Sequence, residues 1–307
     1  MKPLSRIWKL SGSLSALAMI IYPAVDASAR EVRFDRPAGH FTESLPLGNG
    51  RLGAMIFGGV GTERIVLNES GMWSGSPQNA DRPDAAAALP EIRRLLLEGK
   101  NAEAEALVNQ NFTCAGEGSG RGRGAEKPYG SYQVLGNLYL EFDDSAEEVV
   151  ASYGRVLDLE TATARLDYTK GGVAHQRRGF VSAPDNVFVY ELTADIPHSL
   201  NLHIRMGRPE RATAAVTSDG DIELHGELPN GWSSGRGVRF AARVRIADTD
   251  GELLPGADSI HVTNASRLTL LVSAATDIRS FAGRPVEDAR RQALADLDRL
   301  DGRTVAD

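Results

Sequence analysis

Cysteines, aromatic residues and long apolar runs are scarce in this chain of 307 residues. It has one cysteine, Cys114, so it cannot form an internal disulfide, and we interpret this residue, which lies in a polar segment, as incidental rather than nucleophilic. Aromatic residues make up 6% of the chain, whereas glycine is frequent at 32 residues and favours many turns. Beyond residue 25 no apolar run is long enough to cross a bilayer.

The chain also lacks an excess of positive charge. Its formal net charge is -7. A mildly acidic surface argues against nucleic acid or an anionic membrane as a partner. The length suits one large domain or two ordinary ones with a sizeable core.

The first residues carry the features of an export signal. Basic residues precede an apolar stretch over 10–25, and Ala27-Ser28-Ala29 fits an A-x-A cleavage site. A single membrane anchor is the alternative, which Pro23 and the small residues at the end of the stretch disfavour. We expect residues 1–29 to be a signal peptide and the mature chain to begin near Arg30. The protein would then be secreted or periplasmic, without a membrane partner after cleavage.

Most of the remaining sequence has the pattern of β-strands. Short strands and tight turns are indicated over 31–82. From residue 135 to 273, runs such as NLYLEF, NVFVYELTA and RLTLLVSAA alternate apolar and polar residues, with turn residues between them. This spacing predicts a mainly all-β fold of antiparallel sheets packed face to face.

Two segments have helical periodicity instead. Over 84–109 we predict a first helix capped by Asp84 and ended by Gly99, and a second capped by Asn101. The segment 285–300 is amphipathic. One face of it carries Val286, Ala289, Ala293, Leu297 and Leu300. We expect that face to lie partly exposed unless another domain covers it.

The stretch LGNGRLGAM at 47–55 fits the G-x-G-x-x-G pattern of dinucleotide-binding loops. Such a loop needs a buried strand before the glycines and a helix after them. Here Pro46 disfavours the strand, and Gly58-Gly59 leaves no room for the helix. We therefore predict no cofactor. Asn49-Gly50 instead favours a type I′ hairpin turn, in which both residues have positive φ.

Other catalytic patterns lack the context that they need. GWSSG at 231–235 fits the nucleophile elbow G-x-S-x-G, but a strand-like segment follows it, which favours a polar turn. The six histidines are scattered and none has the H-E-x-x-H spacing, so we predict no transition-metal site. Asp143 and Asp144 would point to opposite faces of a strand, and no carboxylate pair identifies itself as an acid/base pair.

One segment, ERIVLNESGMWSGSPQNADRPDAA at 63–86, is a candidate sugar site. A predicted strand leads into a loop rich in hydrogen-bonding groups. Amides and carboxylates bind sugar hydroxyls, and an indole can cover the apolar face of a sugar ring. Asn68, Glu69 and Trp73 are therefore candidate substrate-binding residues. In the alternative, Trp73 is a core residue and the others form turns.

Several long motifs between about Arg33 and about Thr276 carry a family resemblance. They are, in order, LPLGNGRLGAMIFGGVGTERIVLNES, GMWSGSP, LPEIRRLLLEGKNAEAEALV, YQVLGNLYLEF and YGRVLDLETATARLDYTKGGVAHQRRGFVSAPDNVFVYELTAD. Together they resemble the N-terminal domain of glycoside hydrolase family 95, whose activities are mainly α-L-fucosidase and also α-L-galactosidase. The resemblance implies a β-supersandwich.

The resemblance also implies where the chemistry lies. In that family a Glu acts as general acid and Asn and Asp activate a water for inverting hydrolysis, all in an (α/α)₆ barrel that follows the β domain. Residues 30–280 would be the sandwich, and 281–307 the start of the helical linker to a barrel that is absent here. We therefore expect no catalytic residue, no activity of this chain alone, packing against the barrel, and a fucosylated glycan as substrate of the full-length enzyme.

Two other function classes stay open. The sandwich could be a stand-alone carbohydrate-binding module that holds a sugar on Trp73. It could also be an isomerase of the aldose mutarotase type, which would need a histidine base and a carboxylate facing one sugar.

Overall fold

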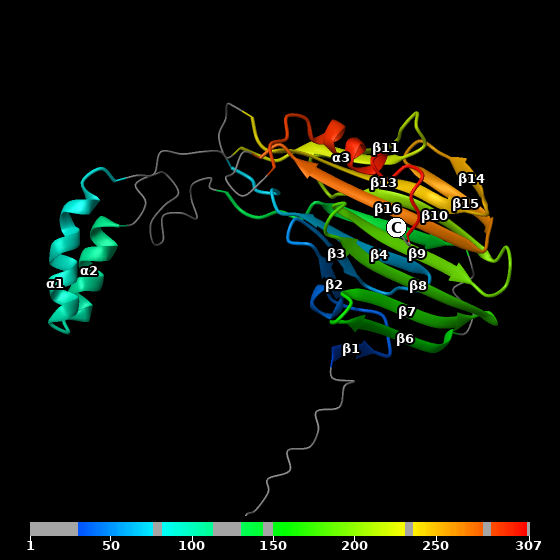
Figure 1. Ribbon diagram of the computed structural model, residues 1–307, viewed down its shortest axis with the longest axis horizontal. Helices are drawn as coiled ribbons and strands as arrows, with labels where there is room; N and C mark the ends of the chain where they lie inside the picture. Colours follow the sequence, from blue (N-terminus) through cyan, green and yellow to red (C-terminus); the bar gives the residue numbers. More distant parts are fainter. Residues whose placement is uncertain are drawn as a thin grey trace, which may run out of the picture. The chain divides into compact units, whose positions relative to one another are not determined.

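A computed structural model describes residues 30–75, 82–112, 130–143, 150–230, 236–278 and 284–305 (Figure 1). The predicted signal peptide, Cys114, Asp144 and the GWSSG motif at 231–235 lie outside the described residues. Among the described residues, no helix is both long and apolar enough to span a bilayer.

Two antiparallel sheets make up most of the described chain (Figure 1). In spatial order, the nine-stranded sheet contains β1 (Glu31–Phe34), β6 (Val150–Asp158), β7 (Thr163–Lys170), β8 (Val173–Ser182), β9 (Val187–Ala194), β16 (Arg267–Thr276), β13 (Arg239–Thr249), β12 (Ile222–Glu227) and β11 (Ala212–Val216). The seven-stranded sheet contains β14 (Glu252–Pro255), β15 (Ser259–Ala265), β10 (Leu200–Gly207), β5 (Gly136–Phe142), β4 (Thr62–Glu69), β3 (Leu52–Ile56) and β2 (Leu45–Gly48). The predicted mainly all-β fold is confirmed.

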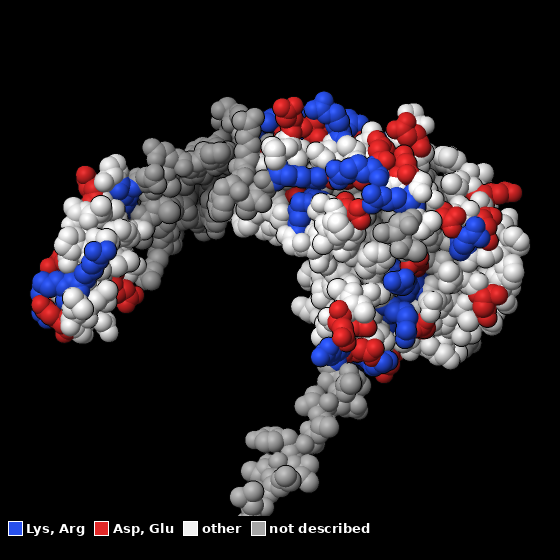
Figure 2. All heavy atoms as spheres, in the orientation of Figure 1, with Lys and Arg blue, Asp and Glu red and all other residues white. Residues whose placement is uncertain are grey.

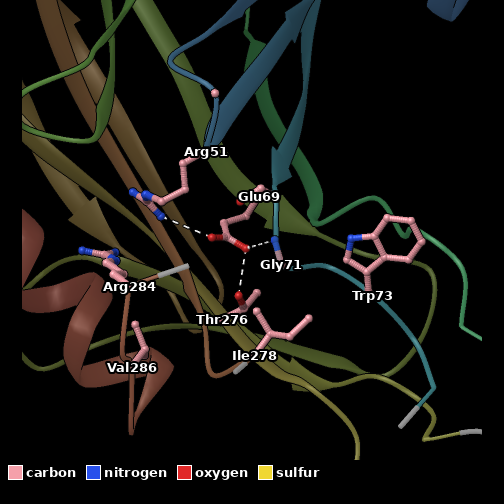
Figure 3. A pocket seen from close by; sticks show the side chains of 10 residues that line it. Arg51, Glu69, Gly71, Trp73, Thr276, Ile278, Arg284 and Val286 are labelled. Carbon is pink, nitrogen blue, oxygen red and sulfur yellow. Dashed lines mark hydrogen bonds and ion pairs between the residues drawn. The ribbon is translucent and has the colours of Figure 1, made fainter. Parts of the chain in front are cut away.

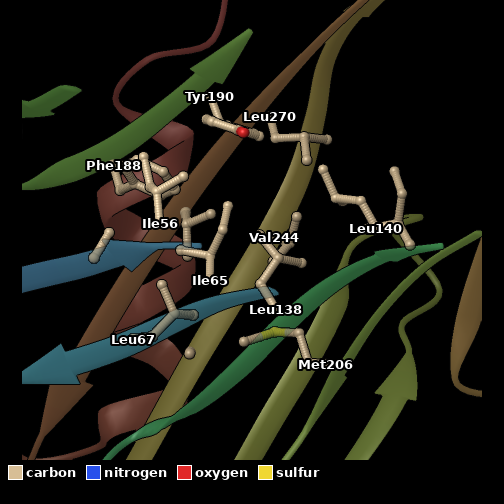
Figure 4. Close-up of a cluster of buried hydrophobic side chains, with 14 of the residues drawn as sticks. Ile56, Ile65, Leu67, Leu138, Leu140, Phe188, Tyr190, Met206, Val244 and Leu270 are labelled. Atoms are coloured by element: carbon tan, nitrogen blue, oxygen red, sulfur yellow. The ribbon is translucent and has the colours of Figure 1, made fainter. Parts of the chain in front are cut away.

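The main core lies between the two sheets. Along β10, buried Leu202, Ile204 and Met206 alternate with more exposed residues, because successive side chains of a strand point to opposite faces. Figure 4 shows side chains from both sheets meeting in this cluster, among them Ile65 of β4 and Val244 of β13. The alternation that marks the strands in the sequence therefore also defines the inner face of each sheet.

A charged pair is buried between the sheets as well. The Arg177 Nη1 atom of β8 lies 3.1 Å from the Glu63 Oε2 atom of β4, and both side chains are at most 1% exposed. Tyr190 donates its hydroxyl to the same carboxylate at 3.0 Å, and the Gly58 N–H donates to the other oxygen at 2.8 Å. Burial raises the pKa of Glu63, against the opposing effect of the Arg177 charge. The pair links one sheet to the other.

The C-terminal helix α3 (Ala289–Asp298) packs on the outer face of the nine-stranded sheet. Ala289 and Ala293 are buried against Ala241 of β13 and Ala275 of β16. Of the face expected to lie partly exposed, Val286, Ala289, Ala293 and Leu297 are buried and Leu300 is partly buried. Most of the face is therefore covered, because two small sheet residues let the helix approach the strands closely. Figure 2 shows basic and acidic side chains next to one another in this region, and Arg290 pairs with Glu223 of β12 at 2.7 Å.

The predicted pair of helices is present as α1 (Leu89–Leu97) and α2 (Asn101–Asn111), with Gly99 between them at a φ of +74°. Two smaller 3₁₀ turns occur, η2 (Phe41–Glu43) and η3 (Ala85–Ala88). The predicted caps are wrong. Asp84 stands at the N-cap of η3, but its side chain makes no capping hydrogen bond. In α2 the N-cap is Lys100, and Asn101 is the first helical residue. The helices share a small core of their own, formed by Ile92, Leu95, Ala104, Ala88 and Leu107.

Candidate functional site

The hairpin of β2 and β3 presents Arg51 at the end of the seven-stranded sheet. Gly48 pairs with Gly53, so the predicted hairpin exists. The predicted type I′ turn is wrong, since Gly50 has a φ of +90° but Asn49 does not have a positive φ. The Asn49 Oδ1 atom instead accepts hydrogen bonds from the N–H groups of Arg51 at 3.0 Å and Leu52 at 2.8 Å, so a side chain replaces part of the usual turn bonding.

Arg51 is held by a backbone acceptor of β16 and by a side-chain acceptor of the turn between β8 and β9. Its Nη1 atom donates to the Ala274 carbonyl of β16 at 2.7 Å, and its Nε atom donates to the Asn186 Oδ1 atom at 3.2 Å. Burial lowers the pKa of Arg51, and the nearby Arg284 charge acts in the same direction, while Glu69 opposes both. These contacts fix the guanidinium in one place beside the end of β4.

Glu69 is the last residue of β4 and is buried (Figure 3). Its Oε2 atom accepts hydrogen bonds from the Gly71 N–H at 2.7 Å and from the Thr276 hydroxyl at 2.9 Å. Its Oε1 atom lies 3.4 Å from the Arg51 Nη1 atom. The carboxylate therefore ties the turn after β4 to the end of β16, and it is the polar floor of a pocket.

That pocket has a volume of about 260 Å³, a little below the range of about 300–1,000 Å³ common for small-molecule sites. It is lined by Gly50, Arg51, Glu69, Ser70, Gly71, Trp73, Thr276, Ile278, Arg284 and Val286. Figure 3 shows Arg51, Glu69 and Thr276 converging on its floor, with Trp73 farther out along the chain. A polar floor with an exposed indole at one edge suits a ligand that has both hydroxyls and an apolar face.

The three residues predicted from the sequence occupy different places. Trp73 is 46% exposed and packs edge-to-face on Tyr132 with 5.6 Å between ring centroids, so it is not a core residue. Glu69 lies in the pocket floor, with its carboxylate bonded within the protein. Asn68 precedes it on β4, where alternation turns its side chain to the opposite face, and it does not line the pocket.

Arg51, Thr276 and Arg284 are lining residues that the sequence analysis does not identify. Arg51 follows Asn49-Gly50 directly, so its place in a predicted hairpin turn could have marked it as a candidate site residue. Thr276 and Arg284 are more than 200 positions away from Glu69 and have no motif. Thr276 ends β16 and Arg284 precedes α3, so the two residues reach the pocket only through the tertiary packing of these elements.

Arg284 connects the pocket wall to α3. Its Nη1 atom donates to the Asp296 Oδ1 atom at 2.9 Å, and this carboxylate is fully buried. Arg299 and Gln292 donate to the same Asp296 oxygen at 2.7 and 3.0 Å. The helix thus holds one wall of the pocket by a buried carboxylate with three donors.

The described residues that line the pocket include one carboxylate, that of Glu69. Glycoside hydrolysis ordinarily requires two carboxyl groups on either side of the scissile bond. Three protein groups already contact the Glu69 carboxylate.

Three proteins similar in sequence to the chain are named as α-fucosidases. "Alpha-L-fucosidase 2" of Arabidopsis thaliana is 38% identical over 175 residues, which cover 57% of this chain and 19% of that protein. "Probable alpha-fucosidase A" of Aspergillus niger is 33% identical over 196 residues, 61% of this chain and 22% of that protein. A protein of the same name from Aspergillus oryzae is 27% identical and covers 80% of this chain and 33% of that protein. The chain thus spans a third or less of these relatives.

The fold also resembles a solved structure, "Putative kojibiose phosphorylase from human microbiome". The TM-score is 0.51 at 10% identity, over 90% of this chain and 36% of that chain. At this identity the likeness concerns the fold alone.

A family model identifies the domain itself. The model described as "Glycosyl hydrolase family 65, N-terminal domain" matches residues 32–280. The prediction of an N-terminal glycoside hydrolase domain is confirmed. The matching model is that of family 65, and the assignment to family 95 stays a prediction. The chain belongs to the N-terminal domains of glycosyl hydrolase family 65.

Proposed function

We propose that this chain is the N-terminal sandwich of an α-L-fucosidase-type glycoside hydrolase, and that the pocket around Glu69 forms part of the rim of its sugar site. The observation that carries the proposal is the 38% identity to a protein named as an α-L-fucosidase. The exposed Trp73 beside a polar pocket supports a role in sugar binding. The substrate would be an α-L-fucosyl or α-L-galactosyl glycan.

Catalysis would come from residues outside this pocket. In the proposed division of labour, a following barrel supplies the acid and the activated water for inverting hydrolysis, while the sandwich supports the barrel and lines the site entrance. A stand-alone carbohydrate-binding module is the second candidate, favoured by the same exposure of Trp73. The DNA sequence downstream of the codon for Asp307 separates the two, since a barrel-coding frame supports the enzyme and a stop codon supports the module.

Sugar binding can be measured on the chain itself. We expect L-fucose at millimolar concentration to shift the indole NMR signal of Trp73, and we expect Trp73→Ala to weaken L-fucose binding in calorimetry without unfolding the protein. Phe41→Ala is the matched control, because Phe41 is also exposed, at 49%, but does not line the pocket. Equal shifts with D-glucose, or an undisturbed indole at saturating L-fucose, would contradict a fucose-binding role for the pocket.

Export is the second part of the proposal. The basic start, the apolar stretch over 10–25 and Ala27-Ser28-Ala29 support cleavage by a signal peptidase. We expect material secreted by an expression host to begin at Arg30 when its N-terminus is sequenced. A secreted or membrane-bound protein that still begins at Met1 would be evidence for an anchor instead.

A further inference from the structure

Two histidines and an aspartate meet on the outer face of the seven-stranded sheet. His203 of β10 and His261 of β15 are direct partners in the strand register. Asp143 follows β5, and its N–H donates to the Asn201 carbonyl at 3.0 Å, which extends the pairing of β5 with β10. Three adjacent strands therefore bring together residues that are about 60 positions apart in the chain.

The side chains of these residues converge on the carboxylate. The His261 Nε2 atom lies 2.7 Å from the Asp143 Oδ2 atom, and the His203 Nε2 atom lies 3.8 Å from the Asp143 Oδ1 atom. The two imidazole rings stack with 4.0 Å between centroids. One potential ligand atom from each residue lies within 4.8 Å of the others.

We propose that Asp143, His203 and His261 bind a divalent transition metal ion of the Zn²⁺ type. Zinc bonds to imidazole nitrogen and carboxylate oxygen are about 2.0–2.2 Å long, so tetrahedral ligand atoms lie roughly 3.3–3.6 Å apart. The two histidines approach different oxygens of the Asp143 carboxylate, at 2.7 and 3.8 Å, so a shared ion would require the side chains to rotate toward one common oxygen. Three protein ligands would leave a fourth position for water.

The surroundings favour this ligand set over a larger one. Glu141 lies opposite His203 in the register, but its Oε1 atom already accepts from Arg205 Nε at 2.9 Å and Nη2 at 2.6 Å. On the other side, Leu254 of β14 lies opposite His261 and is 53% exposed. Two nitrogen ligands and one oxygen suit Zn²⁺, Ni²⁺ or Cu²⁺, whereas Ca²⁺ and Mg²⁺ prefer oxygen ligands only.

The proposed metal site is separate from the sugar pocket, and it is contrary to the expectation, drawn from the sequence, of no transition-metal site. That expectation considered spacing along the chain, where no metal motif occurs. The site arises from sheet register instead, and the ion would join β5, β10 and β15 across their outer face.

Metal binding to the purified, metal-stripped chain is the test. We expect one Zn²⁺ per chain in a titration against a chromophoric chelator, a rise in Tm with Zn²⁺, and no response to Ca²⁺. His203→Ala, His261→Ala and Asp143→Asn should each weaken Zn²⁺ binding about tenfold or more. His40→Ala is the matched control, because His40 is exposed and lies outside the cluster.

The variants also separate metal loss from misfolding. All three replaced side chains are 26–45% exposed, so the Tm of the metal-free variants should equal that of the metal-free parent chain. A sample loaded with Co²⁺ should absorb visible light with the high intensity that is typical of tetrahedral coordination, which would support the same site. The proposal is overturned if Zn²⁺ does not bind, or if it binds with equal affinity to the parent chain and to His203→Ala and His261→Ala.

Discussion

At the scale of single residues, Gly71 shows how tightly the pocket floor is assembled. A Cβ atom at this position would lie 2.0 Å from the Thr276 Oγ1 atom, 2.6 Å from the Ile278 Cγ2 atom and 2.9 Å from the Glu69 Oε2 atom. Its N–H also donates to Glu69. A side chain here would therefore separate the turn after β4 from the end of β16 and open the floor of the pocket.

We predict that Gly71→Ala lowers the free energy of unfolding by about 1–3 kcal/mol, the usual cost of an overpacked site. Urea denaturation measures the change. Gly154→Ala is the control, since a Cβ atom at Gly154 meets nothing within 4 Å and Gly154 has no positive φ. Equal stability of Gly71→Ala and Gly154→Ala would contradict the described packing of Thr276 on the turn.

The buried pair of Glu63 and Arg177 gives a second prediction at this scale. Glu63→Gln removes the charge that compensates Arg177, and we expect it to lower the free energy of unfolding by about 3–5 kcal/mol. In Glu63→Gln/Arg177→Met no unpaired charge remains, so the double variant should be less destabilised than the single one. Thermal or urea unfolding of all four forms in a double-mutant cycle measures this. A double variant that loses the sum of both single effects would show that the two charges do not act as a pair.

At the scale of elements, the start of α3 determines how firmly the pocket wall is held. Asp288 occupies the N-cap and accepts hydrogen bonds from the N–H groups of Arg290 at 2.9 Å and Arg291 at 3.1 Å. The bond from Arg291 lowers the pKa of Asp288 below its ordinary value of 3.8, while desolvation opposes the shift and the bond from Arg290 adds to it. The ionised form is therefore the one that the fold favours.

We predict that Asp288→Ala costs about 1 kcal/mol of stability at neutral pH, as for other N-caps. Because the folded pKa is lowered, the stabilisation is present above pH 3.8 and is lost as the pH falls through the folded pKa. The stability difference between the parent chain and Asp288→Ala should then shrink in acid. Thermal unfolding at neutral pH and in acid measures it, with Asp288→Asn as the control that keeps a capping oxygen. A difference that grows in acid would contradict the cap.

The elements also show what a sequence can predict. Alternation along β10 and the helical spacing of α1 are local patterns, so strands and helices were predicted correctly. The turn at Asn49-Gly50 was predicted wrongly because the Asn49 side chain bonds to the Arg51 and Leu52 N–H groups. The burial of the α3 face was missed since its partners, Ala241 and Ala275, are distant in the chain.

At the scale of the whole molecule, the candidate site is assembled from segments that are far apart in the sequence. Glu69 and Trp73 were found because they belong to one polar stretch. Arg51, Thr276 and Arg284 join them through the hairpin, β16 and the segment before α3. Side-chain chemistry can be inferred from local composition, whereas convergence on one pocket depends on sheet order and on the packing of a helix across it.

We predict that the isolated chain does not hydrolyse an α-L-fucoside by itself. The described residues that line the pocket include one carboxylate, and its oxygens already accept bonds from Gly71, Thr276 and Arg51. A general acid contributes about 10²–10⁴-fold to such a reaction, so a chain without the acid and the water activator should show background rates alone. We expect no release of p-nitrophenol from p-nitrophenyl α-L-fucoside, followed at 405 nm against a barrel-containing α-fucosidase as positive control. Turnover that survives Glu69→Gln would place a catalytic pair elsewhere in this chain, and turnover abolished by it would make Glu69 itself catalytic; either result would contradict the division of labour between sandwich and barrel.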